Sequence, residues 1–195
     1  MKKILLLTAI AVFGFTSMNA QDDFADKAKN GSFYLGANVG FPFSTAGDIT
    51  SFNFGFDGAY LFEVVDNLEI GGLLGYTHFI ADGDYRYYDW NDGDYFVQNY
   101  KDASFIPIAA SARYYFGNHK FFGGLDLGVG INVSGDAKTG FYARPKFGFD
   151  LGTIALIASF QSISGGVDYG DTYTGGTYVS GSGFNSFNFG VEFGF

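Results

Sequence analysis

The last nine residues of the chain, Phe187–Phe195, place a large apolar side chain at every second position and end on a phenylalanine. Side chains alternate between the two faces of a β-strand, so this period predicts a strand with one apolar face. The other face carries Asn188, Gly190, Glu192 and Gly194. That face has too little charge for a surface in water and too much polarity for a core. A closed barrel in lipid accounts for both, because aromatic side chains meet acyl chains while small polar groups fill a narrow wet interior.

The same alternation recurs in seven further segments, so the sequence predicts an all-β fold, an eight-stranded antiparallel transmembrane β-barrel. A tilted strand needs about 9–11 residues to cross a membrane, and each segment is of that order. The connections are short turns on one side and mostly longer loops on the other, as in outer-membrane barrels. The even strand number places both ends of the barrel on the short-turn, periplasmic side. The expected strands span residues 32–41, 52–62, 68–80, 104–116, 121–133, 141–151, 153–162 and 183–195.

A soluble barrel or sandwich, such as a lipocalin-like carrier, would show the same period with the opposite sidedness. Its polar face would meet bulk water, where about 25–35% of surface residues are charged. Here the polar faces are chiefly Gly, Ser, Asn and Thr, and many of the acids lie in loops. The sequence therefore favours the membrane barrel. Its 30 glycines and 21% aromatic residues suit packed strands with tight turns.

The N-terminus predicts export. Lys2 and Lys3 precede a short apolar run over residues 4–15, and Thr16–Ala20 has the character of a cleavage region before Gln21. We therefore expect a signal peptide over residues 1–20, a short periplasmic tail over 21–31 and the barrel over 32–195. The chain has no cysteine, so disulfides do not stabilise it.

Charge and composition exclude several classes of partner. The net charge of −9 disfavours nucleic acid, whose phosphates need clustered Lys and Arg. Two histidines and no cysteine remove most transition-metal sites. We expect no cofactor.

Two prolines fall within expected strands, where a missing N–H interrupts the hydrogen-bond ladder. For Pro107 and Pro145 the sequence predicts a bulge or a position at the rim of the barrel.

Three features of the chain carry a resemblance: the signal-like segment ending Asn19-Ala20-Gln21, the strand Ile106–Phe116, and the aromatic C-terminal strand. With these features residues 31–195 resemble the Bacteroidetes-type outer-membrane β-barrel domain family, of OmpA- and OmpX-like architecture. The resemblance implies location in the outer membrane and assembly by the barrel-assembly machinery. It also implies that the machinery reads the alternating C-terminal residues Phe187, Phe189, Val191, Phe193 and Phe195. The family hosts adhesins, structural anchors and small ligand channels, so it implies little about activity.

Strand parity turns several ionisable side chains inward. An eight-stranded barrel is filled by its own side chains, and charges in that space must pair. Arg113, Asp126 and Lys146 lie on consecutive strands, which predicts a lateral network. A structural polar plug is favoured over an ion or proton path. The expected interior polar residues are Asp57, Glu69, Arg113, Asp126, Arg144, Lys146 and Glu192.

The enzyme interpretation is weak, and we do not expect catalysis. His119 lies in a short periplasmic turn. His78 lies near the outer end of an expected strand, on its lipid face, with no serine close by in sequence. A nucleophile and its base must lie within about 3 Å, and another strand could supply the partner. An aromatic role at the membrane interface is favoured for His78.

The long loops are rich in aromatic and small polar residues, the composition of binding loops. Tyr and Trp also form interfacial girdles, which is the simpler interpretation. The candidate binding residues are Tyr87, Tyr88, Trp90, Tyr173 and Tyr178. No metal site is expected. The weak candidates are Asp89, Asp92 and Asp94, whose spacing does not match an EF-hand although hard oxygen ligands suit Ca²⁺ or Mg²⁺.

The sequence thus predicts an outer-membrane protein with a structural or surface-interaction role through its extracellular loops. The alternative is a narrow channel for small or hydrophobic solutes, and a lipid-modifying enzyme is a third class. The expected partners are outer-membrane lipid, the barrel-assembly machinery and an extracellular protein or glycan, with the chain a monomer.

Overall fold

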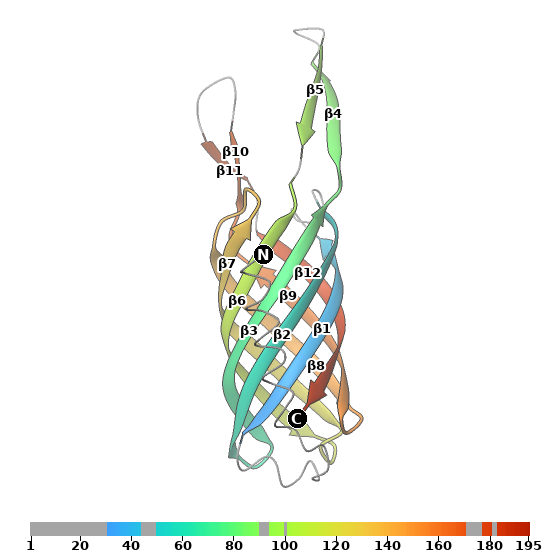
Figure 1. Cartoon of the computed structure of the whole chain (residues 1–195), viewed down its shortest axis with the longest axis vertical. Helices are drawn as coiled ribbons and strands as arrows, with labels where there is room; N and C mark the ends of the chain where they lie inside the picture. The colour runs from blue at the N-terminus through green and yellow to red at the C-terminus, as the bar shows by residue number, and fades with distance from the viewer. Residues whose placement is uncertain (1–30, 44–49, 90–93, 100, 171–176, 181–182) are drawn as a thin grey trace, which may run out of the picture.

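Eight long strands close on themselves into an antiparallel barrel (Figure 1). The computed structural model describes residues 31–43, 50–89, 94–99, 101–170, 177–180 and 183–195. Each barrel strand pairs with its neighbour along the chain, and the last closes on the first. The strands are β1 (Ser32–Phe43), β2 (Thr50–Val65), β3 (Leu68–Ala81), β6 (Ala103–Phe116), β7 (Phe121–Ser134), β8 (Gly140–Asp150), β9 (Ile154–Ile163) and β12 (Phe184–Gly194). The predicted fold is confirmed, and the predicted strand ends lie within three residues of the observed ones.

Two of the predicted long loops contain hairpins of their own. β4 (Asp84–Asp89) pairs with β5 (Asp94–Asn99), and β10 (Val167–Gly170) pairs with β11 (Thr177–Ser180). Both hairpins extend beyond the same end of the barrel (Figure 1). For these four strands only the backbone is described.

Tight turns connect the strands at the opposite end. In the β6–β7 turn Gly117, Asn118 and His119 have φ of 62°, 58° and 60°. Glycine and asparagine tolerate this left-handed region better than other residues, so the local sequence suits a tight turn. Phe33 at the start of β1 and the terminal Phe195 exchange two backbone hydrogen bonds of 3.1 and 2.8 Å, which ties both ends of the barrel to this side.

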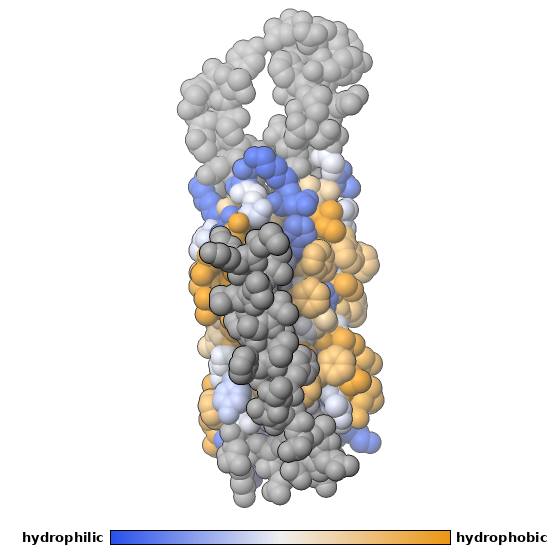
Figure 2. All heavy atoms as spheres, viewed as in Figure 1, coloured by the Kyte–Doolittle hydropathy of each residue, from blue (hydrophilic) through white to orange (hydrophobic). Residues whose placement is uncertain are grey.

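The apolar face of every strand points outward. On β7, the side chain of Leu127 is 42% exposed, whereas its neighbour Asp126 is fully buried inside. On the face that Figure 2 shows, hydrophobic residues form a belt over the visible part of the barrel, and hydrophilic residues lie near its upper rim. A soluble carrier would place these faces the other way round. The exterior is therefore that of an outer-membrane-type barrel, whose belt contacts lipid.

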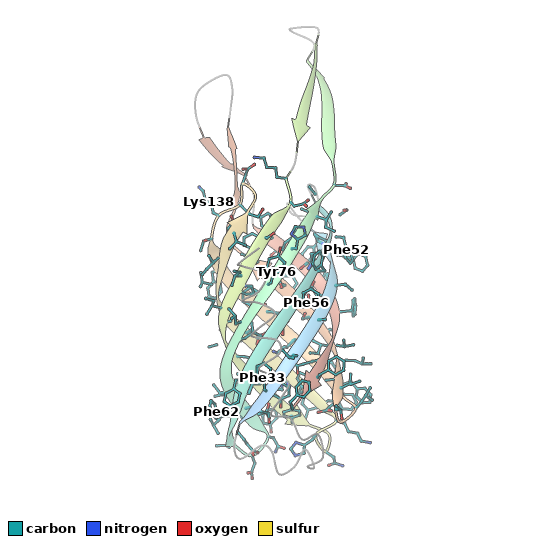
Figure 3. The ribbon with its side chains drawn as sticks, viewed as in Figure 1. Phe33, Phe52, Phe56, Phe62, Tyr76 and Lys138 are labelled. Carbon is teal, nitrogen blue, oxygen red and sulfur yellow. The ribbon has the colours of Figure 1, made fainter. Side chains whose placement is uncertain are left out.

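Aromatic side chains gather on the outer surface toward both ends of the belt. Figure 3 shows Phe33 and Phe62 toward the short-turn end and Phe52 and Tyr76 toward the hairpin end. Ring contacts continue along the short-turn end, with centroid distances of 5.0–6.1 Å between neighbouring rings. This is the arrangement of the aromatic girdles of transmembrane barrels. The rings that make these contacts are Phe116, Phe121, Phe147 and Phe149.

The expectation of a bulge or rim position at each proline is wrong. Pairing between β3 and β6 skips Pro107 and resumes in the same register, and pairing between β8 and β9 does the same at Pro145. Both prolines stay in register with β7. A proline can lose its ladder bond on one side without an inserted residue, so the strand keeps its alternation and the register is preserved. The register shifts occur elsewhere, at Thr50/Phe52, Glu63/Val65 and Ser104/Phe105.

Within the described part of the chain, no helix is long and apolar enough to cross a membrane.

Candidate functional site

The middle of the barrel interior holds a cluster of buried charges centred on Asp126 of β7. The Arg144 Nε donates to Asp126 Oδ2 at 2.8 Å, and the Lys146 Nζ lies 2.9 Å from Asp126 Oδ1. The Ser111 hydroxyl also donates to Asp126. The Arg144 Nη1 donates to Asp57 Oδ2 at 2.8 Å and thereby spans the interior from β8 to β2. Two cations thus face two carboxylates, and the cluster is close to neutral.

A second charged cluster lies at the short-turn end. The Arg113 Nη2 lies 2.6 Å from Glu192 Oε1, and both side chains are almost fully buried. The guanidinium sits 4.2 Å from the ring centroids of both Tyr34 and Phe122, so two aromatic faces sandwich the cation. It also donates to the Tyr115 hydroxyl at 3.2 Å.

Glu69 joins this second cluster through a tyrosine. The Tyr34 hydroxyl donates to its two carboxylate oxygens at 3.0 and 3.1 Å. All seven ionisable residues expected inside therefore lie inside, and these contacts link them in two groups. Arg113 is not part of the Asp126 group, which corrects the expected network of Arg113, Asp126 and Lys146. The strand register explains the difference, because the cross-strand partner of Asp126 is Ser111, whereas Arg113 lies opposite Gly124.

The interior near the hairpin end is apolar, which corrects the expectation of a polar lumen throughout. Phe79, Phe105 and Phe184 are fully or almost fully buried, with ring centroids 5.0–6.1 Å apart, and Ile163 packs with them. In these strands the outward-facing apolar residues set the alternating pattern. The pattern therefore did not predict the inward phenylalanines at the strand ends. Three inward aromatics at one level point to an apolar plug rather than a wet channel.

Amides and hydroxyls lie between the charged and apolar layers. The Asn53 Nδ2 donates to Asn188 Oδ1 at 2.7 Å, and the Gln161 Nε2 donates to the Thr77 hydroxyl at 3.4 Å. A cavity of about 10 Å³ beside Arg113 and Glu192 has room for no more than about one water molecule. Charged clusters, amides and hydroxyls, and packed aromatic rings thus follow one another along the described interior.

The alternating C-terminal residues lie on the outer face of the closing strand. Phe187, Phe189, Val191 and Phe193 point outward from β12, which pairs with β9 on one side and β1 on the other. Phe195 is half-buried and follows the end of the strand. This arrangement leaves the apolar face of the last strand in contact with lipid.

The structure does not describe the side chains of the candidate binding and metal residues in the loops. Trp90, Asp92 and Tyr173 fall outside the described residues. Asp89 and Asp94 are backbone partners in the β4–β5 hairpin, with their side chains outside the description. The same holds for the side chains of Tyr87, Tyr88 and Tyr178, on β4 and β11. Among the residues whose side chains are described, no group of three or more His, Asp or Glu is placed to hold a metal ion.

Comparison with solved structures gives likenesses in fold at low sequence identity. Neisserial surface protein A is 15% identical, with 84% of this chain and 96% of that chain aligned and a TM-score of 0.43. Ail, the attachment invasion locus protein of Yersinia pestis, is 12% identical, with 85% and 97% aligned and a TM-score of 0.43. A de novo designed transmembrane β-barrel is 10% identical, with 84% and 95% aligned and a TM-score of 0.46. No family model and no curated protein match the chain.

Proposed function

We propose that this outer-membrane β-barrel protein is a closed scaffold that presents two hairpins outside the cell for surface interaction. The observation that supports this most is the filled interior. Two charged clusters, a layer of amides and three buried phenylalanines occupy the space that a channel would need. The barrel then serves as a rigid support, and function belongs to the parts beyond it.

The hairpins suit this role by their placement. Both lie at the end of the barrel opposite the short turns (Figure 1). With the short turns on the periplasmic side, the hairpins face the exterior. Tyr87, Tyr88, Trp90, Tyr173 and Tyr178 are the proposed contact residues, because rigid aromatics among small polar residues give contact area at little cost in entropy. The proposed ligand is an extracellular protein or glycan.

The purified protein in a planar lipid bilayer should give no steady unitary current. An ion would have to displace buried charge pairs and cross a layer of packed rings, and both steps oppose conduction. Single-channel recording over a range of voltages measures this. A reproducible steady conductance would support the narrow channel for small or hydrophobic solutes instead.

Replacement of residues 84–99 by a two-residue turn should leave the barrel intact and weaken surface binding. Among the described residues, β4 and β5 pair with each other and with no strand of the barrel, so their loss breaks none of its eight ladders. Mobility on a gel before and after boiling reports the folded barrel, and an array of glycans and extracellular matrix proteins reports binding. Loss of heat-modifiable mobility, or array binding by the shortened protein equal to that of the full chain, would contradict the proposal.

The remaining expectations belong to the same proposal. We infer an N-terminal signal peptide over residues 1–20 and a periplasmic tail over 21–31, which precede the described barrel. The outward β12 residues Phe187, Phe189, Val191 and Phe193, with Phe195, are the proposed signal for the barrel-assembly machinery. The resemblance to the Bacteroidetes-type barrel domains supports this assignment, and a monomer is the proposed assembly state.

A further inference from the structure

A serine, a histidine and an aspartate meet on the outer face of the barrel near its hairpin end. The Ser104 Oγ lies 2.8 Å from the Nδ1 of His78, and the Nε2 of His78 lies 3.3 Å from the Oδ2 of Asp102. No serine lies close to His78 in the sequence, and the neighbouring strand β6 supplies one. His78 on β3 and Ser104 on β6 are directly opposed cross-strand partners, and such pairs bring side chains into contact.

The order of these contacts is that of an activated nucleophile. With its proton on Nε2, His78 turns its N–H side toward the Asp102 carboxylate, and Nδ1 can accept the Ser104 hydroxyl proton. A hydroxyl becomes nucleophilic when an adjacent base takes its proton and a third group orients that base. Here the histidine nitrogens exchange the roles that they have in serine proteases.

Neighbouring groups hold the three residues in place. The backbone N–H of Ala81 donates to Asp102 Oδ1 at 2.9 Å, which fixes the carboxylate at the rim. The Phe54 ring lies 5.2 Å from the His78 ring, centroid to centroid. The Tyr76 hydroxyl donates to the Ser104 Oγ at 3.1 Å. Ser104 is only 3% exposed, so the side chains packed around it, Tyr76 among them, must turn aside to admit a substrate.

Position along the barrel selects the class of substrate. His78 lies three residues from the end of β3. At about 3.3 Å per residue and a strand tilt of about 40°, this places it roughly 8 Å below the rim along the barrel axis. Asp102 is half exposed at the rim itself, whereas the outward residues nearer the middle of β3 and β6 are exposed apolar side chains such as Leu74 and Ile108. Figure 3 shows Tyr76 on this part of β3. The cluster therefore lies where acyl chains give way to head groups, which is the depth of the ester bonds of lipids.

We propose that His78, Ser104 and Asp102 form a hydrolytic site for the acyl esters of lipids in the outer leaflet. The Ser104 Oγ forms a bond to the ester carbonyl carbon and passes its proton to His78 Nδ1. The ester C–O bond breaks, and the departing alcohol takes that proton. Water then attacks the acyl-serine, His78 takes the water proton, and Ser104 recovers it as the fatty acid leaves. Ser104 and His78 are the catalytic residues, and Asp102 is a positioning residue.

The first test is covalent labelling of the folded full-length protein in nanodiscs with a fluorophosphonate probe. We expect labelling of Ser104, identified by peptide mass spectrometry, with none in Ser104→Ala and at least about a hundredfold slower labelling in His78→Ala. Ser162→Ala is the matched control, since Ser162 also lies on the outward-facing positions of its strand, β9, and pairs with Ala143 and Asn185. Absence of labelling in the wild-type protein, or equal labelling in Ser104→Ala, overturns the proposal. Heat-modifiable gel mobility shows that each variant is folded.

The second test identifies the lipid. Fatty acid release is measured from nanodiscs of phospholipid alone and from nanodiscs that also contain lipopolysaccharide, which separates the two sources of acyl ester. Release that is lost in Ser104→Ala supports the proposal, and labelling of Ser104 without release from either lipid overturns it. Asp102→Asn should slow labelling of Ser104, because the carboxylate that faces the His78 Nε2 is lost, and Asp102→Glu should restore part of the rate. Labelling of Asp102→Asn at the wild-type rate, or no recovery in Asp102→Glu, would overturn the positioning role.

Discussion

Replacement of Asp126 by alanine should destabilise the barrel by about 3–5 kcal/mol, the usual effect of removing one partner from a buried ion pair. Asp126 is fully buried and contacts Arg144, Lys146 and Ser111. Without it, Lys146 loses its contact with a carboxylate, and Arg144 keeps only Asp57. The folded fraction against urea, read from gel mobility before and after boiling, measures the change.

Asp136→Ala is the control for this experiment. Asp136 pairs with Lys101 at 3.2 Å at the rim, where both side chains are more than half exposed. Exposed ion pairs contribute about 0–1 kcal/mol to the free energy of unfolding, so the urea midpoint of this variant should scarcely move. If Asp126→Ala shifts the unfolding free energy no more than Asp136→Ala, the interior charge cluster does not stabilise the fold. Single-channel recording of Asp126→Ala in a planar bilayer would show whether the interior charge cluster also blocks ions.

Leu127→Arg should destabilise the barrel by about 2–4 kcal/mol, although it lies next to Asp126 in sequence. The alternation of β7 turns Leu127 outward, near the middle of the strand and of the hydrophobic belt. A guanidinium there must be desolvated by acyl chains or reach toward a head group. Urea titration in phospholipid vesicles measures the loss.

Val133→Arg provides the matched comparison on the same face of the same strand. Val133 lies one residue from the outer end of β7, where an added cation costs about 0–1 kcal/mol. A larger loss of unfolding free energy for Leu127→Arg than for Val133→Arg would match the greater depth of Leu127 in the bilayer. Equal losses at the two positions, or none at Leu127, would mean that this face does not contact lipid.

The sequence by itself determined the strands and the direction of each side chain. A period of two fixes which residues share a face, so Asp126 and Leu127 could be assigned to opposite sides without a structure. The scarcity of charge on the polar faces settled which side met lipid. The eight barrel strands followed from the same pattern, because each is long enough to cross and ends at a recognisable connection.

The tertiary structure alone decided which inward residues meet. Arg113 and Glu192 lie 79 positions apart in the chain, yet their charged atoms are 2.6 Å apart across the closed barrel. His78 and Ser104 become partners because β3 pairs directly with β6, past the hairpin β4–β5. Alternation says which face a side chain takes, but its height and its neighbour depend on the stagger and tilt of all eight strands at closure. That stagger belongs to the whole ring of strands, so no single stretch of sequence contains it.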